Sequence, residues 1–311
     1  MGKASFTDIV LWLTLAAMWS SSYAVIKIGV ATLEPAVLVF GRLLVGSIVI
    51  YAVMRWRGLT FSRDPEVWFS FAVTGLLGSA APFLLITHGE RSVDSALASI
   101  LMGASPVMTL LLAAWLVPQE RLTLRTLAGI IGGLAGVAVL VGPAALAGLG
   151  AQLGGQLAIL AATACYAAST VYIRRAVTRP PLEMAAGSML VATLMMGCVI
   201  AFSGAQLGQI DFGATSLGAV LYLGLFSTAC ANLIYFHLVP RLGATRMSQV
   251  NFAVPVGGAL LGFLLLGEAL TAQRLIALAI IIGSIYLGTS KSAGPVSARG
   301  TPPPAGHPPR R

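Results

Sequence analysis

Aromatic and hydroxyl side chains recur with the same helical spacing in two distant segments of the sequence. The first segment carries Trp19, Ser22, Tyr23 and Ile26, and the second carries Tyr166, Ser169, Thr170 and Ile173. Residues spaced i, i+3, i+4 and i+7 share one helical face, so each set predicts a stripe along a helix. Aromatic walls accept apolar groups or cations and hydroxyls orient polar groups, which makes both stripes candidates for lining a cavity that binds amphipathic solutes. The alternative is structural, with rings filling gaps between helices and hydroxyls bonding to nearby backbone.

Few other polar residues fall inside apolar segments. Arg42 lies within one, where its guanidinium either neutralises a substrate carboxylate or snorkels to the membrane interface. Lys27, at the end of its segment, is expected to snorkel. In the second half, Asn232 and Asn251 are the polar candidates for contacting substrate.

Two histidines, His88 and His237, stand at the ends of apolar segments. Histidine titrates near neutrality, so either residue is a candidate gate or proton acceptor. The alternative is that each caps a helix C-terminus, where a cation is favoured by the helix dipole.

Two prolines, Pro106 and Pro255, fall in the middle of apolar segments. Proline lacks a backbone donor, so it is expected to free the carbonyls four residues earlier, those of Met102 and Asn251. Such carbonyls at membrane depth must find a partner or line water. The prolines are therefore predicted hinges, with improved helix packing as the alternative.

The acidic residues indicate no catalytic or metal chemistry. All ten fall in expected loops or at segment ends, so no carboxylate cluster for a metal, no buried proton or sodium relay and no cofactor site is predicted. Glu120 and Glu268 are expected to cap the helices that they precede. No G-x-S-x-G motif is present, so an intramembrane enzyme is a remote alternative. A channel is equally remote, because no ring of charge or filter-like repeat is present.

The elements that position these residues must be membrane helices. Of 311 residues, 57% are hydrophobic and 9% are charged, whereas a soluble domain carries roughly a quarter charged residues. The net charge of +9 is spread thinly between apolar runs, which argues against a nucleic-acid partner. Ten runs approach the ~20 residues needed to cross a bilayer: 9–29, 36–54, 67–87, 94–117, 122–142, 154–173, 182–203, 213–238, 244–266 and 271–289.

Basic residues predict the orientation of the chain. Fifteen Lys and Arg fall on the side of the N-terminus and three on the other, which places both termini in the cytoplasm. The Pro-rich stretch 290–311 is predicted to be a disordered cytoplasmic tail.

The chain also contains an internal repeat. Shifted by 149 residues, positions 75–116 give twelve identities in 42, where roughly four are expected by chance, and they include His88/His237 and Pro106/Pro255. Five spans per half is an odd number, so the halves enter the membrane from opposite sides. The predicted fold is an all-α membrane protein with ten transmembrane helices as two inverted five-helix repeats, 1–149 and 150–289. This architecture is typical of alternating-access carriers.

The ordered motifs resemble the EamA branch of the drug/metabolite transporter superfamily. They are Trp19-Ser20-Ser21 with Lys27, Pro35 with Arg42, Ser99 with Pro106-Val107, Glu120-Arg121-Leu122-Thr123, Pro255-Val256 and Gly267-Glu268-x-Leu270-Thr271. The resemblance implies a multi-pass carrier of the bacterial cytoplasmic membrane, most similar to exporters of amino acids and related metabolites, some of which expel cationic drugs. In the second half Tyr166 replaces the tryptophan, and Gly187 or Ser188 stands where Arg42 would repeat, so a symmetric anion clamp is not expected.

The functional prediction is therefore a carrier for small amphipathic metabolites, with the lipid bilayer and a small-molecule substrate as its partners. An organic-phosphate or nucleotide-sugar exchanger is the alternative substrate class, disfavoured because it requires several cations in the cavity. The motifs Gly129-x-x-x-Gly133 and Gly132-x-x-x-Gly136 predict close helix packing, either between halves or in a weak homodimer, with a monomer as the other state. Proton coupling, facilitated transport and exchange stay open.

Overall fold

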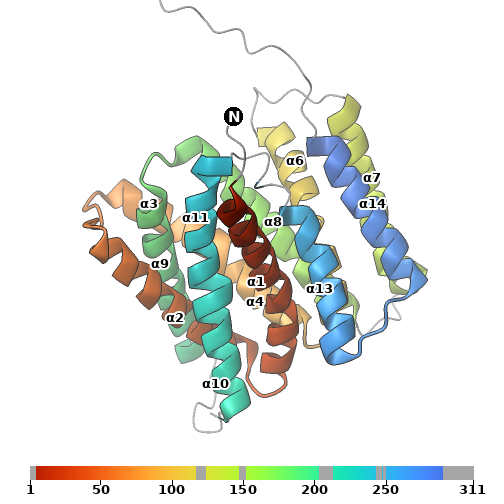
Figure 1. Ribbon diagram of the computed structural model, residues 1–311, viewed down its shortest axis with the longest axis horizontal. Helices are drawn as coiled ribbons and strands as arrows, with labels where there is room; N and C mark the ends of the chain where they lie inside the picture. Colours follow the sequence, from red (N-terminus) through yellow and green to blue (C-terminus); the bar gives the residue numbers. More distant parts are fainter. Residues whose placement is uncertain are drawn as a thin grey trace, which may run out of the picture.

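Every element of the computed structural model is helical in the part of the chain that it describes, residues 5–116, 124–146, 152–202, 213–242, 247 and 250–289 (Figure 1). The first half comprises α1 (Phe6–Val30), α2 (Pro35–Trp56), α3 (Pro65–Gly75), the π-helical η1 (Leu76–Ala80), α4 (Ala81–Gly89), α5 (Ser95–Met102), α6 (Ser105–Leu116) and α7 (Leu124–Leu146). The second comprises α8 (Leu153–Ala176), α9 (Pro181–Phe202), α10 (Ala214–Leu221), the π-helical η3 (Tyr222–Cys230), α11 (Ala231–Leu242), α13 (Val250–Leu266) and α14 (Ala272–Thr289). The all-helical prediction is confirmed for these residues.

Seven of the described helical segments are long and apolar enough to cross a membrane. Seven candidate spans are Phe6–Val30, Pro35–Trp56, Pro65–Gly89, Ser95–Leu112, Leu153–Ile173, Pro181–Phe202 and Ala214–Val239, and three shorter apolar helices are Leu127–Leu140, Ala253–Leu266 and Ala272–Leu287. Each of the ten predicted runs overlaps one of these helices. The predicted tail and Glu120 lie outside the described residues.

Local sequence sets where several helices begin. Ser5 and Asp8 form a capping box at the start of α1, each side chain accepting from the other's backbone N–H at 3.1 Å. Pro35 and Pro65 are the first residues of α2 and α3, where a missing N–H disturbs no helical hydrogen bond. These signals lie in the loops and so extend the helices beyond the apolar runs.

The two mid-run prolines occupy different settings. The chain breaks at Gly103 and Ala104, so Pro106 is the second residue of α6 rather than a kink inside a continuous helix. Pro255 does lie inside a continuous helix, α13. Next to it, Ser20 donates to the carbonyl of Val254 at 3.3 Å. The two prolines therefore differ in their local setting, because a helix start tolerates proline without freeing an interior carbonyl, and their role as hinges stays a prediction.

Two π-helical segments occupy matched positions of the repeat. Residues 76–80 of η1 correspond to residues 225–229 of η3 under the 149-residue shift. Each segment packs against a helix of the other half, η1 against α9 and η3 against α2. π-Helical turns often occur at functional sites, and η3 contributes directly to the site described below.

Glycines bring helices of the two halves together along α7 and α14, which lie side by side in Figure 1. A Cβ on Gly136 would lie 2.8 Å from Ile281, and one on Gly132 would lie 2.6 Å from the Ser284 hydroxyl. A Cβ on Gly133 instead meets Val107 of α6. The predicted small-residue motif thus serves packing within the chain.

Gly75 supports a similar contact between α3 and α9. A Cβ there would lie 2.6 Å from the Ser188 carbonyl and 3.3 Å from the Ala192 nitrogen, both backbone atoms. We expect Gly75→Ala to lower the free energy of unfolding by about 1–3 kcal/mol, because the two helices must separate. Gly283→Ala in α14, where nothing lies within 4 Å, is the matched control and should have no such effect. Equal unfolding curves for both variants in detergent would contradict the close contact.

Candidate substrate-binding site

Arg42 lies in α2 and is buried, with 7% of its surface exposed; it is the only buried charged residue of that helix, which the structure describes throughout. Its Nε donates to the hydroxyl of Thr228 in η3 at 2.8 Å, and its Cζ lies 3.7 Å from the ring centroid of Phe83 in α4. The guanidinium therefore faces the interior at a junction of the two halves. The snorkelling alternative is not what the structure shows.

The guanidinium keeps donors for a ligand. Within the described part of the chain, the guanidinium makes one hydrogen bond, from Nε, and its two terminal nitrogens make none. A planar guanidinium presents paired N–H groups that match a carboxylate. The stacking on Phe83 fixes its orientation, because a cation is attracted to the face of an aromatic ring.

Tyrosines from both predicted stripes lie close to this arginine. Tyr23 of α1 and Tyr166 of α8 are both within electrostatic range of Arg42 and of each other. Tyr23 is buried in the largest apolar cluster, and the half-buried Tyr166 packs against the same cluster. One tyrosine from each half therefore lies within electrostatic range of the guanidinium.

The other stripe residues have structural partners in this arrangement. Trp19 packs on Tyr235 of α11 with ring centroids 5.9 Å apart, in a separate apolar cluster. The Ser22 hydroxyl donates to the Trp19 carbonyl at 2.6 Å, and the Thr170 hydroxyl donates to the Tyr166 carbonyl at 2.8 Å. Ser169 is buried and closely approaches Gly78 of η1. For these residues the geometry matches the structural alternative.

None of the remaining predicted site residues hydrogen-bonds to Arg42 within the described part of the chain. His88, His237 and Asn251 are exposed. Asn232 donates to the Thr228 carbonyl of its own helix at 2.7 Å. Met102 ends α5 and packs half-buried against the largest apolar cluster.

A buried acid, Glu90, was missed at the sequence level. It directly follows α4, is 0% exposed, and neither carboxylate oxygen has a hydrogen-bond partner in the described part of the chain. Lys27 does not snorkel but donates to the carbonyls of Glu90 and Val93, at 2.6 and 2.8 Å. The expectation that no acid is buried is therefore wrong. One feature of the sequence pointed to burial: under the 149-residue shift, Glu90 aligns with the apolar Val239.

Other buried acids have clear structural roles. Glu183 pairs with Arg179 at 2.8 Å and accepts from the Ser62 backbone nitrogen at 2.9 Å. Asp8 pairs with Arg241 at 2.8 Å. Among described residues, no group of three or more His, Cys, Asp or Glu is arranged to hold a metal ion.

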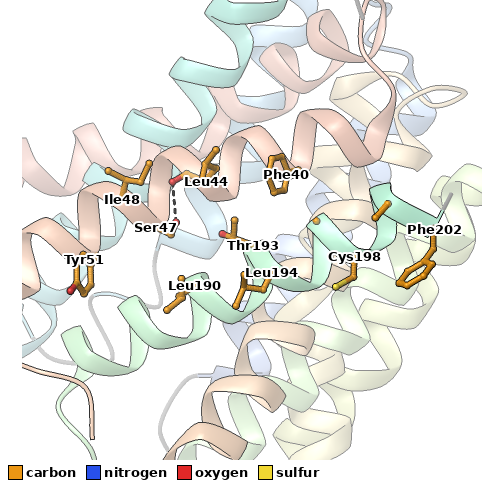
Figure 2. A pocket seen from close by; sticks show the side chains of 12 residues that line it. Phe40, Leu44, Ser47, Ile48, Tyr51, Leu190, Thr193, Leu194, Cys198 and Phe202 are labelled. Carbon is orange, nitrogen blue, oxygen red and sulfur yellow. Dashed lines mark hydrogen bonds between the residues drawn. The ribbon is translucent and has the colours of Figure 1, made fainter. Parts of the chain in front are cut away.

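A separate groove lies between α2 and α9 and has a volume of about 670 Å³ (Figure 2). Its lining is almost wholly apolar: Phe40, Leu44, Ser47, Ile48, Tyr51, Leu190, Thr193, Leu194, Gly197, Cys198, Ala201 and Phe202. The hydroxyls of Ser47 and Thr193 donate to their own helices, to Leu44 at 3.0 Å and Met189 at 2.7 Å. None of the predicted site residues lines this groove, and it offers no charge to a polar ligand.

Comparisons with known proteins identify the kind of machinery to which the site belongs. A model of the EamA-like transporter family matches residues 7–142 and 153–289. The uncharacterized inner membrane transporter YedA of Escherichia coli K12 is 28% identical over 88% of this chain and 88% of its own length. A "probable amino-acid metabolite efflux pump" of Salmonella typhimurium LT2 is 27% identical over 90% of this chain and 94% of its own.

An uncharacterized transporter of Archaeoglobus fulgidus is 25% identical over 90% of this chain and 99% of its own length. A solved crystal structure at 23% identity superposes with a TM-score of 0.65, covering 92% of this chain and 98% of that one. The relatives are named as transporters, and the solved structure has the same fold.

Proposed function

The chain belongs to the EamA-like transporter family and is a multi-pass membrane protein, and on that premise we propose that it exports small amphipathic metabolites, foremost amino acids, by alternating access. The single observation that carries the substrate class is the buried Arg42, held by Thr228 and Phe83 with its terminal nitrogens available. A guanidinium in a low-dielectric interior favours a carboxylate ligand. The efflux-pump relative supports amino acids as the substrate class, and cationic drugs are secondary candidates that the aromatic rings favour.

The proposed architecture is ten transmembrane helices in two inverted repeats, 1–149 and 150–289, with a cytoplasmic tail at 290–311. The packing of the helices supports this architecture, because contacts between the halves recur with the two halves exchanged. α1 packs on α13 as its counterpart α8 packs on α6, and α4 packs on α8 as its counterpart α11 packs on α1. The two separate family matches lie within these repeats. Alternating access then consists of relative motion of the halves around the shared arginine site. We place both termini in the cytoplasm and the protein in the cytoplasmic membrane of a bacterium, as a monomer or weak homodimer.

The chemistry around Arg42 favours transport of carboxylates over the alternatives. An organic phosphate or nucleotide sugar calls for several cations, whereas Lys27 of α1 already donates to two backbone carbonyls. We infer that the protein is a carrier rather than an enzyme, consistent with relatives named as transporters.

Counterflow in proteoliposomes tests this function directly. Liposomes preloaded with an unlabelled compound take up the labelled compound only if the carrier recognises it. The panel comprises amino acids, quaternary-ammonium drugs and phosphorylated sugars, with empty liposomes as the background. Amino-acid counterflow is the expected result; counterflow restricted to phosphorylated sugars, or product formation without solute movement, would overturn the proposal.

The aromatic residues give a second test. Trp19→Ala and Tyr166→Ala are both expected to impair counterflow in folded protein, and Tyr166→Ala more strongly, by roughly tenfold, because Tyr166 lies near Arg42. Tyr166→Phe is the matched control, which keeps the ring and should retain most activity. Unchanged counterflow in both alanine variants would remove the aromatic side chains from the substrate site.

A further inference from the structure

The carboxylate of Glu90 lies in a setting that disfavours its charge. It is fully buried at the end of α4, and neither oxygen receives a hydrogen bond in the part of the chain that the structure describes. A buried, unpaired carboxylate is strongly destabilising, and such a group becomes neutral by taking up a proton instead. Within the described residues, no capping bond, ion pair or metal-binding group accounts for this side chain.

Within the described part of the chain, none of the charged neighbours of Glu90 donates a hydrogen bond to its carboxylate. From α1, Lys27 donates to two backbone carbonyls, and from α2, Arg42 donates to Thr228. From the loop before α14, Glu268 accepts from the Ser95 and Ala96 nitrogens. Tyr23 of α1 is the remaining titratable group within electrostatic range. No neighbouring cation therefore supplies a hydrogen bond that would hold Glu90 ionised.

Electrostatics agree with this geometry. Burial raises the pKa of the Glu90 carboxyl well above its usual range; Lys27 and Arg42 oppose that shift, and Glu268 adds to it. Desolvation is the largest of these influences. The neutral acid is thus favoured as long as the site stays closed to water.

The site also lies where the two halves meet. The adjacent Gly89 packs against α8 so closely that a Cβ there would lie 2.7 Å from the Gly155 carbonyl. α4 belongs to the first half and α8 to the second, and these helices are neighbours along their length. Separation of the halves at this end would admit water to Glu90, whereas their contact excludes it.

We propose that Glu90 is a proton-binding site of this carrier, protonated when the halves are closed around it and deprotonated when they open, so that transport is coupled to proton movement. The proton is taken up from water at the opened face, and coupling requires that it is released to water on the other side after the carrier reorients. This inference rests on the proposed alternating access. It replaces the expectation that a relay acid is absent.

The pH dependence follows from the difference between the two states. In the open state the carboxyl is in contact with water and titrates in its ordinary range, whereas in the closed state burial raises its pKa. Protonation of Glu90 therefore favours the closed state. This stabilisation of the closed state is lost as the pH rises from the pKa of the open state towards the pKa of the closed state. Between these two pKa values the equilibrium constant for closing falls by up to about tenfold per pH unit.

Infrared difference spectroscopy tests the site without requiring transport. The reconstituted full-length protein is titrated, and the C=O stretch of a protonated buried carboxyl is followed in wild type and Glu90→Gln. We expect a band that persists near neutral pH in wild type and is missing from the variant. Glu34→Gln, an exposed acid at the start of α2, is the matched control and should leave the band unchanged. The same band in Glu90→Gln, or a response to sodium rather than pH, would overturn the proposal.

Counterflow then tests the coupling. Glutamine mimics the protonated side chain, so wild type and Glu90→Gln should have similar rates at acid pH and diverge as the pH rises, with the variant insensitive to pH. A pH dye inside wild-type liposomes should also report proton movement when a substrate gradient is applied. Parallel pH profiles, or substrate movement without proton movement, would refute coupling through Glu90. A lack of wild-type counterflow with every compound would instead refute the proposed transport function, while the infrared result would still decide the proton site.

Discussion

Arg42→Met is expected to lower counterflow of amino acids by roughly 10- to 100-fold, the largest functional effect that we predict. A hydrogen bond to a charged partner contributes about 1.5–3 kcal/mol, and methionine removes both the charge and the paired donors while roughly preserving the volume. Arg42→Lys should not restore activity, because a lysine ammonium lacks the planar pair of N–H groups. The loss should be specific to substrates that carry a carboxylate. Counterflow across the compound panel measures it.

Thr228→Val provides the control for Arg42. It removes the partner of Nε at 2.8 Å without removing the guanidinium, so we expect a much smaller loss. Arg42→Met should remain folded, since replacing a buried charge by an apolar group of similar volume is often neutral for stability. Thr228→Val should remain folded because valine has nearly the same shape as threonine. Amino-acid counterflow at the wild-type rate in folded Arg42→Met would show that the guanidinium does not bind substrate.

Glu268→Ala is expected to lower the free energy of unfolding by about 2–4 kcal/mol, the largest effect on stability that we predict. The Glu268 carboxylate accepts from the backbone nitrogens of Ser95 and Ala96 at 2.8 and 2.7 Å, at the start of α5. Asp94, the residue that precedes α5, makes no side-chain cap there, because its carboxylate pairs with Arg274 instead. The α5 N-terminus therefore depends on an acid more than 170 residues away in sequence.

Glu34→Ala is the matched control for this prediction. Glu34 also stands at a helix N-terminus, that of α2, but it is exposed and makes no side-chain cap bond, so its loss should change stability little. Glu268→Gln keeps one acceptor oxygen and should show an intermediate effect. Denaturant titrations in detergent measure all three variants, and equal stabilities of Glu268→Ala and Glu34→Ala would show that the long-range cap contributes nothing.

Helix positions were largely predictable because hydrophobicity along the chain is a local property. The runs 9–29 and 36–54 fall inside α1 and α2. The boundaries shifted outwards where capping groups such as Ser5, Asp8 and Pro35 lie beyond the apolar residues. The π-helical turns were not predictable, because an extra residue in a helical turn is stabilised by neighbouring helices and leaves no compositional mark.

The candidate site was predicted in part. The repeated spacing picked out Tyr23 and Tyr166, which lie within electrostatic range of Arg42, but their role in lining a substrate cavity stays a prediction. The same spacing overstated the roles of Ser22 and Thr170, whose hydroxyls donate to their own helices. A local pattern shows which face a hydroxyl lies on, but not whether the backbone carbonyl of the preceding turn is its acceptor.

By itself the sequence determined that the chain is a membrane protein of a transporter family, because apolar runs, basic loops and ordered motifs are all properties of the linear chain. Only the tertiary structure decided that Glu90 is buried without a partner, that Lys27 donates to the carbonyls of a neighbouring loop, and that Glu268 caps α5. The physical reason is that the state of a polar group depends on its surroundings. For these residues the surroundings come from helices far away in sequence, so position relative to an apolar run did not reveal whether a charge is solvated, paired or neutral.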